Sequence, residues 1–259
     1  EDMDIGSNTE NLLRSAACQG IPPPRGLSYR ESPAAGAASL RDLPGLDCRA
    51  TALDGLFARS HNWTGEDPIT GDPLFELEEL GRLPAGQDGG ALFDSTDLRS
   101  IAQVNAYFHA TVFHDFVKGL GFRGLDRLLP LVANARTCAG RSPCETAYYD
   151  PLFPHAAGFG LLVFGASPRV NFALDADVVY HEYAHAVVER AAGLGEDFLD
   201  PDFPFSRALE EGFADYFAAS LAGDPRFAEY AHGTFAGESI RDLEGGRRWP
   251  EGIDLADPQ

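Results

Sequence analysis

The most regular hydrophobic pattern in this chain lies between residues 94 and 119. Four apolar residues recur there at helical spacing and define one face: Ile101, Phe108, Val112 and Phe116. Asp94 or Ser95 is suited to cap the start of a helix, and Gly119 is suited to end it. We therefore predict a long and largely buried helix in this segment.

Two further helical segments follow it. The stretch "DVVYHEYAHAVVERAAG", residues 177 to 193, has Asp175 or Asp177 as its cap and ends in a glycine. The stretch "RALEEGFADYFAASLAG", residues 207 to 223, follows Ser206 as a cap and also ends in a glycine. Both segments are rich in apolar residues, so we expect both helices to be buried on most sides.

The rest of the chain has weaker patterns. The short apolar run "GFGLLVFG", residues 158 to 165, is bounded by glycines and is typical of a buried strand or a sheet edge. Residues 1–90 are rich in Gly, Pro, Asp and Ser, and their weak periodicity predicts an irregular region. The predicted fold class is α+β, with this N-terminal region, a mixed lobe at 91–192 that includes the second helix, and the start of a helical lobe at 193–259.

Composition excludes several kinds of partner. The chain has 259 residues, and 44% of them are apolar, which is typical of a globular protein. No apolar run approaches the roughly 18 residues that a membrane-spanning helix needs. Acidic residues outnumber basic ones 40 to 20, for a net charge of −20. Because such a surface repels phosphate backbones and anionic lipids, we expect neither nucleic acid nor a membrane as partner.

Four cysteines indicate the compartment. Cys138 and Cys144 bracket a short polar loop, and Cys18 could then pair with Cys48 across a segment rich in Pro and Gly. An even number of cysteines without metal-binding spacing favours two disulfides and an extracellular location. The alternative is four reduced thiols in a cytosolic protein. Because the chain starts without an initiator methionine or a signal peptide, we expect a processed, secreted form.

The chemistry of the second helix comes from two histidines. His181 and His185 are four residues apart, so both imidazoles project from one face and can reach a single Zn²⁺. Glu182 points about 100° around the helix, where it borders the metal and can take a proton from a water that the metal acidifies. The alternative is a pair of hydrogen-bonded core histidines.

The third helix supplies the groups that favour the metal site. A catalytic zinc needs a third protein ligand and one open position. Glu211 can complete a His₂Glu site, and Asp215, one turn later, can accept the free ring N–H of a zinc-binding histidine. Glu210 is the competing ligand, but it has no carboxylate four residues later.

At these positions the sequence resembles a known family. "HEYAH" together with "EEGFAD" is similar to the pattern of the gluzincin metallopeptidases, in particular the thermolysin-like and fungalysin-like enzymes. The resemblance covers roughly residues 95–255 and includes the helix that precedes the "GFGLLVFG" strand. It implies a two-lobed zincin-type fold, with a mixed N-terminal lobe that contains a sheet, a helical C-terminal lobe that this chain leaves incomplete, and one zinc ion between them.

The resemblance also implies residue roles and an activity. His181, His185 and Glu211 would bind the catalytic zinc, Glu182 would be the general base, and Asp215 would orient a histidine ligand. Four residues of the apolar strand would hold an extended peptide or protein substrate by strand addition: Gly160, Leu161, Leu162 and Val163. The expected activity is that of a secreted zinc endopeptidase.

The sequence departs from the family pattern in two places. Glu196 stands where thermolysin-like enzymes have a tyrosine, and only 48 residues (259 − 211) follow Glu211. We therefore expect a companion fragment to complete the C-terminal lobe, and His232 is a weak candidate for stabilising the oxyanion. Four acidic residues after the second helix form either a Ca²⁺ site or a solvated loop: Glu196, Asp197, Asp200 and Asp202.

Two other functions remain as alternatives. The first is a catalytically silent scaffold of the same fold that binds peptide or protein, although such a scaffold has no need of Glu182. The second is an aminopeptidase of the wider gluzincin group. Those enzymes carry a Gly-x-Met-Glu-Asn motif, whereas the only methionine here is Met3.

Overall fold

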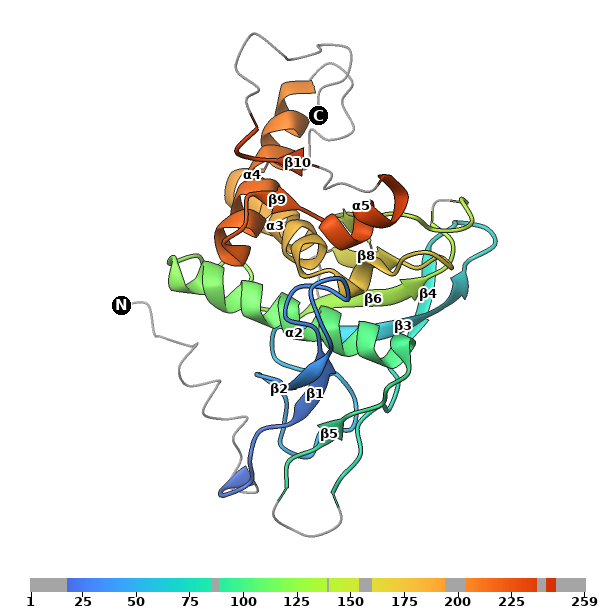
Figure 1. Cartoon of the computed structure of the whole chain (residues 1–259), viewed down its shortest axis with the longest axis vertical. Coiled ribbons are helices and arrows are strands. Elements are labelled where there is room, and N and C mark those ends of the chain that lie inside the picture. Colours follow the sequence, from blue (N-terminus) through green and yellow to red (C-terminus); the bar gives the residue numbers. More distant parts are fainter. Residues whose placement is uncertain are drawn as a thin grey trace.

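The fold is an α+β arrangement of helices and sheets whose strands have mixed orientation (Figure 1). It is given by a computed structural model of the chain. The structure describes these residues: 18–84, 89–138, 140–153, 160–193, 204–236 and 241–245.

A five-stranded sheet forms the centre, in the order β4-β3-β6-β8-β7. Its strands have these bounds: β3 (Ala58–Glu66), β4 (Pro73–Glu76), β6 (Leu129–Ala135), β7 (Ala147–Asp150) and β8 (Leu161–Gly165). The three inner strands run parallel, and the two outer ones pair antiparallel with their neighbours. Every residue of β6 and β8 is buried, as expected for apolar strands covered on both faces.

This topology corrects the expected edge strand. β8 pairs with β6 on one side and with β7 on the other. The backbone of Leu161, Leu162 and Val163 is therefore already hydrogen-bonded within the sheet, and the prediction that this segment adds a substrate strand is wrong. The strand at the edge of the sheet is β7.

The region before residue 90 is more regular than the sequence predicts. Its β3 and β4 belong to the central sheet, paired through β3 to β6. A second, three-stranded sheet has the order β2-β1-β5. Its strands are β1 (Arg25–Ser28), β2 (Ser39–Asp42) and β5 (Leu92–Phe93). The region expected to be irregular therefore contains four strands, β1 to β4, in its described part. These strands lack strict alternation of apolar and polar residues, so periodicity does not reveal them.

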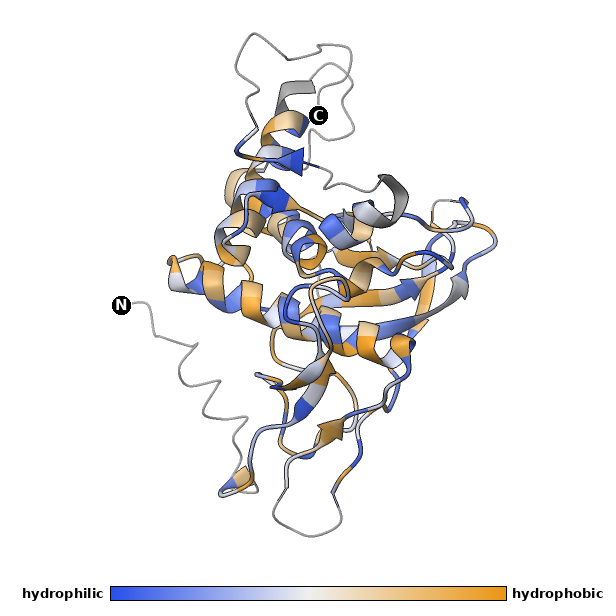
Figure 2. Cartoon of the chain, viewed as in Figure 1, coloured by the Kyte–Doolittle hydropathy of each residue, from blue (hydrophilic) through white to orange (hydrophobic). Residues whose placement is uncertain are grey.

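The long helix α2 (Leu98–Gly119) runs across the sheet and contacts β1, β3 and β6 (Figure 1). The alternating orange and blue bands of α2 in Figure 2 reflect its apolar and polar faces. Asp97 caps it by accepting a hydrogen bond from the backbone N–H of Ser100 at 3.2 Å, so the predicted caps at Asp94 or Ser95 are wrong. The C-cap is Leu120, one residue after the predicted Gly119.

The second predicted helix is α3 (Ala176–Ala192), which follows a short 3-10 turn, η2 (Phe172–Leu174). Asp175 caps α3 by accepting a hydrogen bond from the backbone N–H of Asp177. Gly193 ends α3 in the left-handed conformation, with φ of 68°, as helix ends commonly require. Both of these sequence predictions are confirmed.

The third predicted helix is α4 (Pro204–Ala222), which packs along α3. It begins at Pro204, so the prediction of Ser206 as its cap is wrong, because proline is favoured in the first turn of a helix. Two short strands with one more helix between them follow: β9 (Arg226–Phe227), α5 (Glu229–Ala236) and β10 (Arg241–Asp242). β10 pairs with β9 and brings Arg241 back beside α4.

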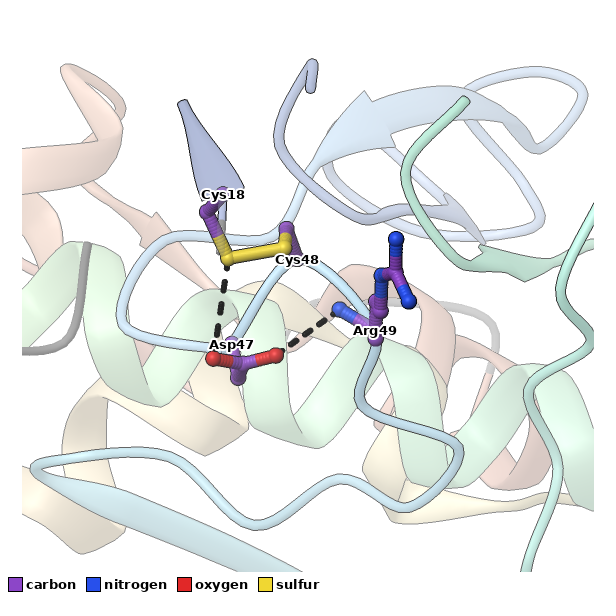
Figure 3. The surroundings of a disulfide bond; sticks show 4 residues. All are labelled: Cys18, Asp47, Cys48 and Arg49. Carbon is purple, nitrogen blue, oxygen red and sulfur yellow. Dashed lines mark hydrogen bonds between the residues drawn. A yellow bond between two sulfur atoms is a disulfide. The ribbon is translucent and has the colours of Figure 1, made fainter. Parts of the chain in front are cut away.

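Two disulfides confirm the predicted pairing of the cysteines. Cys18 bonds to Cys48, and Cys138 bonds to Cys144. Figure 3 shows Asp47 beside the first disulfide, with its Oδ1 accepting a hydrogen bond from the backbone N–H of Arg49 at 3.0 Å. Among the described helices, none is long and apolar enough to cross a membrane.

Candidate metal centre

The two histidines of α3 converge, as their spacing predicts. The Nε2 atoms of His181 and His185 lie 3.0 Å apart, and both residues are buried. The Glu211 carboxylate reaches them from α4, with Oε2 3.3 Å from Nε2 of His181. Donor atoms of all three residues lie within 4.8 Å of one another, which is compatible with a bound metal ion. The structure thus brings together the predicted ligands.

A second layer of carboxylates faces the other nitrogen of each ring. Oδ1 of Asp215 lies 2.9 Å from Nδ1 of His181, as the sequence predicts. Oε1 of Glu210 lies 3.2 Å from Nδ1 of His185, a role that the sequence did not suggest. Glu210 therefore does not compete with Glu211 for the metal. Instead, consecutive residues of α4 serve the two layers, because they project from different faces of the helix.

This layer determines how the rings can be protonated. If each Nδ1–H donates to its carboxylate, each neutral imidazole presents a lone pair at Nε2. Two lone pairs then face each other at 3.0 Å, with the Glu211 carboxylate beside them. Three electron-rich atoms that converge in a buried site repel one another unless a cation lies between them. The donor set therefore fits a metal ion.

The pKa values of His181 and Glu211 are also shifted in the directions that favour a positive charge in the cluster. Burial lowers the pKa of His181, but hydrogen bonds to Asp215 and Glu211 outweigh it and raise the pKa to about 9. Burial raises the pKa of Glu211, but the hydrogen bond with His181 and nearby cationic groups outweigh it and lower the pKa to about 2. In the absence of a metal, the cluster therefore holds a proton.

Glu182 lies beside the cluster without joining it. It is 7% exposed, and it lines the same cavity of about 380 Å³ as His181, His185 and Glu211. Its carboxylate accepts no hydrogen bond from the residues that the structure describes, although burial raises its pKa. Because Glu182 lines the cavity and accepts no hydrogen bond from a described residue, its carboxylate is free to exchange a proton with a molecule there.

Arg241 is a site residue that the sequence did not reveal. Its Nε lies 2.7 Å from Oδ2 of Asp215, and its Nη1 lies 3.7 Å from Oε2 of Glu211. The guanidinium also lies over the ring of Phe227, 5.1 Å from its centroid. Arg241 arrives on β10, far from its partners in the sequence, so no local spacing could have identified it.

The edge strand β7 forms another wall of the cavity. Thr146, Ala147, Tyr148 and Tyr149 line it together with the histidines. Among the described strands, β7 pairs only with β8, and it is the last strand of the sheet on that side. Substrate addition is therefore geometrically available at β7 instead of β8.

Other predicted site residues lie elsewhere. Gly160 is buried at the start of β8, with φ of 75°, and it packs against Tyr149. His232 lies in α5 and does not line the cavity. The acidic residues Glu196, Asp197 and Asp200, together with Asp202, lie outside the described residues. Cys18, Cys48 and Asp47 also cluster, but their two sulfur atoms are joined in a disulfide and do not form a metal site.

The chain was also compared with known proteins. Neither a scan against protein-family models nor a search of the curated proteins finds a match to it. The function therefore has to be inferred from the residues of the site.

Proposed function

We propose that this protein is a secreted zinc endopeptidase of the gluzincin type, with a zincin-type fold. The observation that carries the proposal is the approach of two imidazole Nε2 atoms to 3.0 Å, with Nδ1 of each ring facing a carboxylate. Two nitrogens and one carboxylate oxygen are the ligand set that a catalytic zinc favours, whereas calcium prefers oxygen ligands alone.

His181, His185 and Glu211 would hold the zinc. Bound there, the ion would lower the pKa of a water molecule and polarise a peptide carbonyl. Asp215 and Glu210 would accept the Nδ1–H groups, which keeps each Nε2 lone pair directed at the metal. Arg241 would hold Asp215 in place through its 2.7 Å contact.

Glu182 would move the proton. Its carboxylate would take one proton from the attacking water and later deliver it to the amine nitrogen as the peptide C–N bond breaks. The position of Glu182 in the cavity wall beside the three proposed ligands supports this role, because no hydrogen bond to a described residue holds its carboxylate. The same position argues against the alternative, a catalytically silent scaffold, which has no need of a carboxylate there.

An extended peptide would bind along the outer edge of β7. Main-chain hydrogen bonds to an edge strand hold a peptide without regard to its sequence, which suits an endopeptidase. This wall of the cavity also contains Tyr148 and Tyr149, whose rings can contact apolar side chains of the substrate. The two disulfides are compatible with the proposed extracellular location.

Metal removal and return test this proposal. We expect purified protein to contain about one zinc per chain and to cleave casein. Dialysis against a chelator should abolish cleavage, and added Zn²⁺ should restore it, while added Ca²⁺ alone should not. Cleavage that survives complete removal of zinc would contradict the proposal.

A further inference from the structure

The metal-binding face of α3 extends one turn beyond the ligands. His181, His185 and Glu189 follow one another at intervals of four residues, so they share one stripe of the helix. Oε2 of Glu189 accepts a hydrogen bond from the hydroxyl of Tyr149, a residue of the edge strand β7.

The ring of Tyr149 occupies space that the missing side chain of Gly160 leaves. A Cβ atom on Gly160 would come within 2.6 Å of Cε2 of Tyr149 and within 2.5 Å of the backbone oxygen of Asp150. Gly160 also has φ of 75°, which disfavours any other residue. The glycine that the sequence suggested as a substrate contact therefore makes room for Tyr149.

The hydroxyl of Tyr149 remains a hydrogen-bond donor near neutral pH. Burial, followed by the hydrogen bond with Glu189, raises the pKa of Tyr149 well above its usual value. The Tyr149 hydroxyl therefore keeps the proton that it donates to Oε2 of Glu189. A side-chain hydrogen bond thus links β7 to α3, and Tyr149 at its β7 end also lines the cavity.

We propose that the Tyr149–Glu189 hydrogen bond is a clamp that fixes the outer edge of β7 at a set position relative to the metal ligands. Tyr149 and Glu189 are then positioning residues for an extended peptide, whose backbone pairs with β7 while its scissile bond lies at the cluster. This inference rests on the proposed function. It specifies the substrate class as peptides long enough to pair along the strand, since a short substrate would gain little from a fixed edge.

Kinetics on substrates of two lengths test the clamp. In Tyr149→Phe the ring remains and the hydrogen bond is lost, so we expect KM for an extended peptide to rise about tenfold with kcat nearly unchanged. KM for a short blocked dipeptide amide should change little, and the zinc content should stay at that of the wild type. The single variant Glu189→Gln keeps an acceptor oxygen, so its KM should stay close to that of the wild type. The single variant Glu189→Leu has no acceptor and should behave like Tyr149→Phe.

Tyr107→Phe is the matched control. It also removes a buried tyrosine hydroxyl, one that donates to the backbone oxygen of Pro44 at 2.7 Å, outside the cavity. A purely structural role for Tyr149 predicts that both variants lose stability and that neither changes KM selectively. Equal KM values for the extended peptide in the wild type, Tyr149→Phe and Tyr107→Phe would overturn the clamp.

Amide hydrogen exchange separates this inference from the proposed function. If the wild type cleaves no peptide, the proposed function fails, but the clamp still predicts faster exchange at residues 147–150 in Tyr149→Phe than in the wild type. Exchange in α2 should stay the same in both proteins. Unchanged exchange along β7 would overturn the clamp whether or not the protein is a peptidase.

Discussion

The metal-binding ability of His181 and His185 depends on the carboxylates that face the Nδ1 atoms of their rings. The HExxH spacing places the rings on one face of α3, but it leaves their tautomers open. Asp215 and Glu210 would remove that freedom by accepting a proton from Nδ1, since each has an oxygen 2.9 Å or 3.2 Å from an Nδ1 atom. The lone pairs at Nε2 are then available together, which is what a metal ion requires.

The two carboxylates should therefore affect metal binding without touching the metal. We expect Glu210→Ala and Asp215→Ala each to weaken zinc binding by about 10- to 100-fold, because each leaves one ring without its orienting acceptor. Competition with a chromophoric chelator measures the affinity. Glu76→Gln, which changes an exposed carboxylate on β4, is the control and should bind zinc like the wild type. Wild-type affinity in both alanine variants would argue that the carboxylates do not orient the ligands.

At the scale of elements, one buried and one half-buried carboxylate join the start of α3 to α5. Asp175 accepts hydrogen bonds from the backbone N–H of Asp177 and from that of Ala231, at 3.2 Å and 2.9 Å. Asp177 accepts one from the backbone N–H of Ala228 at 3.4 Å. Burial raises the pKa of both carboxyl groups, and their mutual repulsion together with that of Glu229 contributes to the rise.

This pair predicts a dependence of stability on pH. The folded protein holds protons that the unfolded chain releases above about pH 4, so the contribution of the pair falls as pH rises. Asp177→Asn removes the repulsion, and we expect it to stabilise the protein at pH 8 by about 1 kcal/mol more than at pH 5. Urea unfolding in the presence of a chelator, at both pH values, measures the difference. The same change at both pH values would show that the pair does not titrate in this range.

Elements with strong periodicity were predictable, and elements defined by pairing were not. The three long helices follow from apolar spacing, and for α3 both ends follow from Asp175 and Gly193. The strands before residue 90 have no comparable signal, because β3 is specified by its pairing with β6, some 70 residues later in the chain. The edge position of β7 depends likewise on the order of strands, which local sequence does not encode.

At the scale of the whole molecule, the site could be predicted wherever one helix carried it. His181, Glu182 and His185 lie on α3, and Glu211 and Asp215 lie together on α4. Their spacing within each helix was therefore enough to identify them. Arg241, Tyr149 and the acceptor role of Glu210 depend on how separate elements pack. These contacts arise only when β10, β7 and α4 close around α3, and side-chain chemistry at one position does not specify them.

The proposed ligands, the proposed base and strand β7 line one cavity, so we expect them to act together. The cavity of about 380 Å³ is bounded by β7, α3, α4 and the β9–β10 pair, with the three ligands and Glu182 on its wall. The ligands and the base thus come from α3 and α4, and the peptide edge comes from β7, which lies earlier in the chain. Catalysis should require all of them, whereas zinc binding should require only α3 and α4.

The most direct test compares the wild type with Glu182→Gln for both zinc content and cleavage of casein. Because Glu182 borders the cluster without joining it, we expect about one zinc per chain in both proteins. Only the wild type should cleave, since glutamine cannot accept the proton from the attacking water. Equal cleavage by the two proteins would remove Glu182 from the mechanism, and the absence of zinc from both would leave His181 and His185 as buried, hydrogen-bonded histidines.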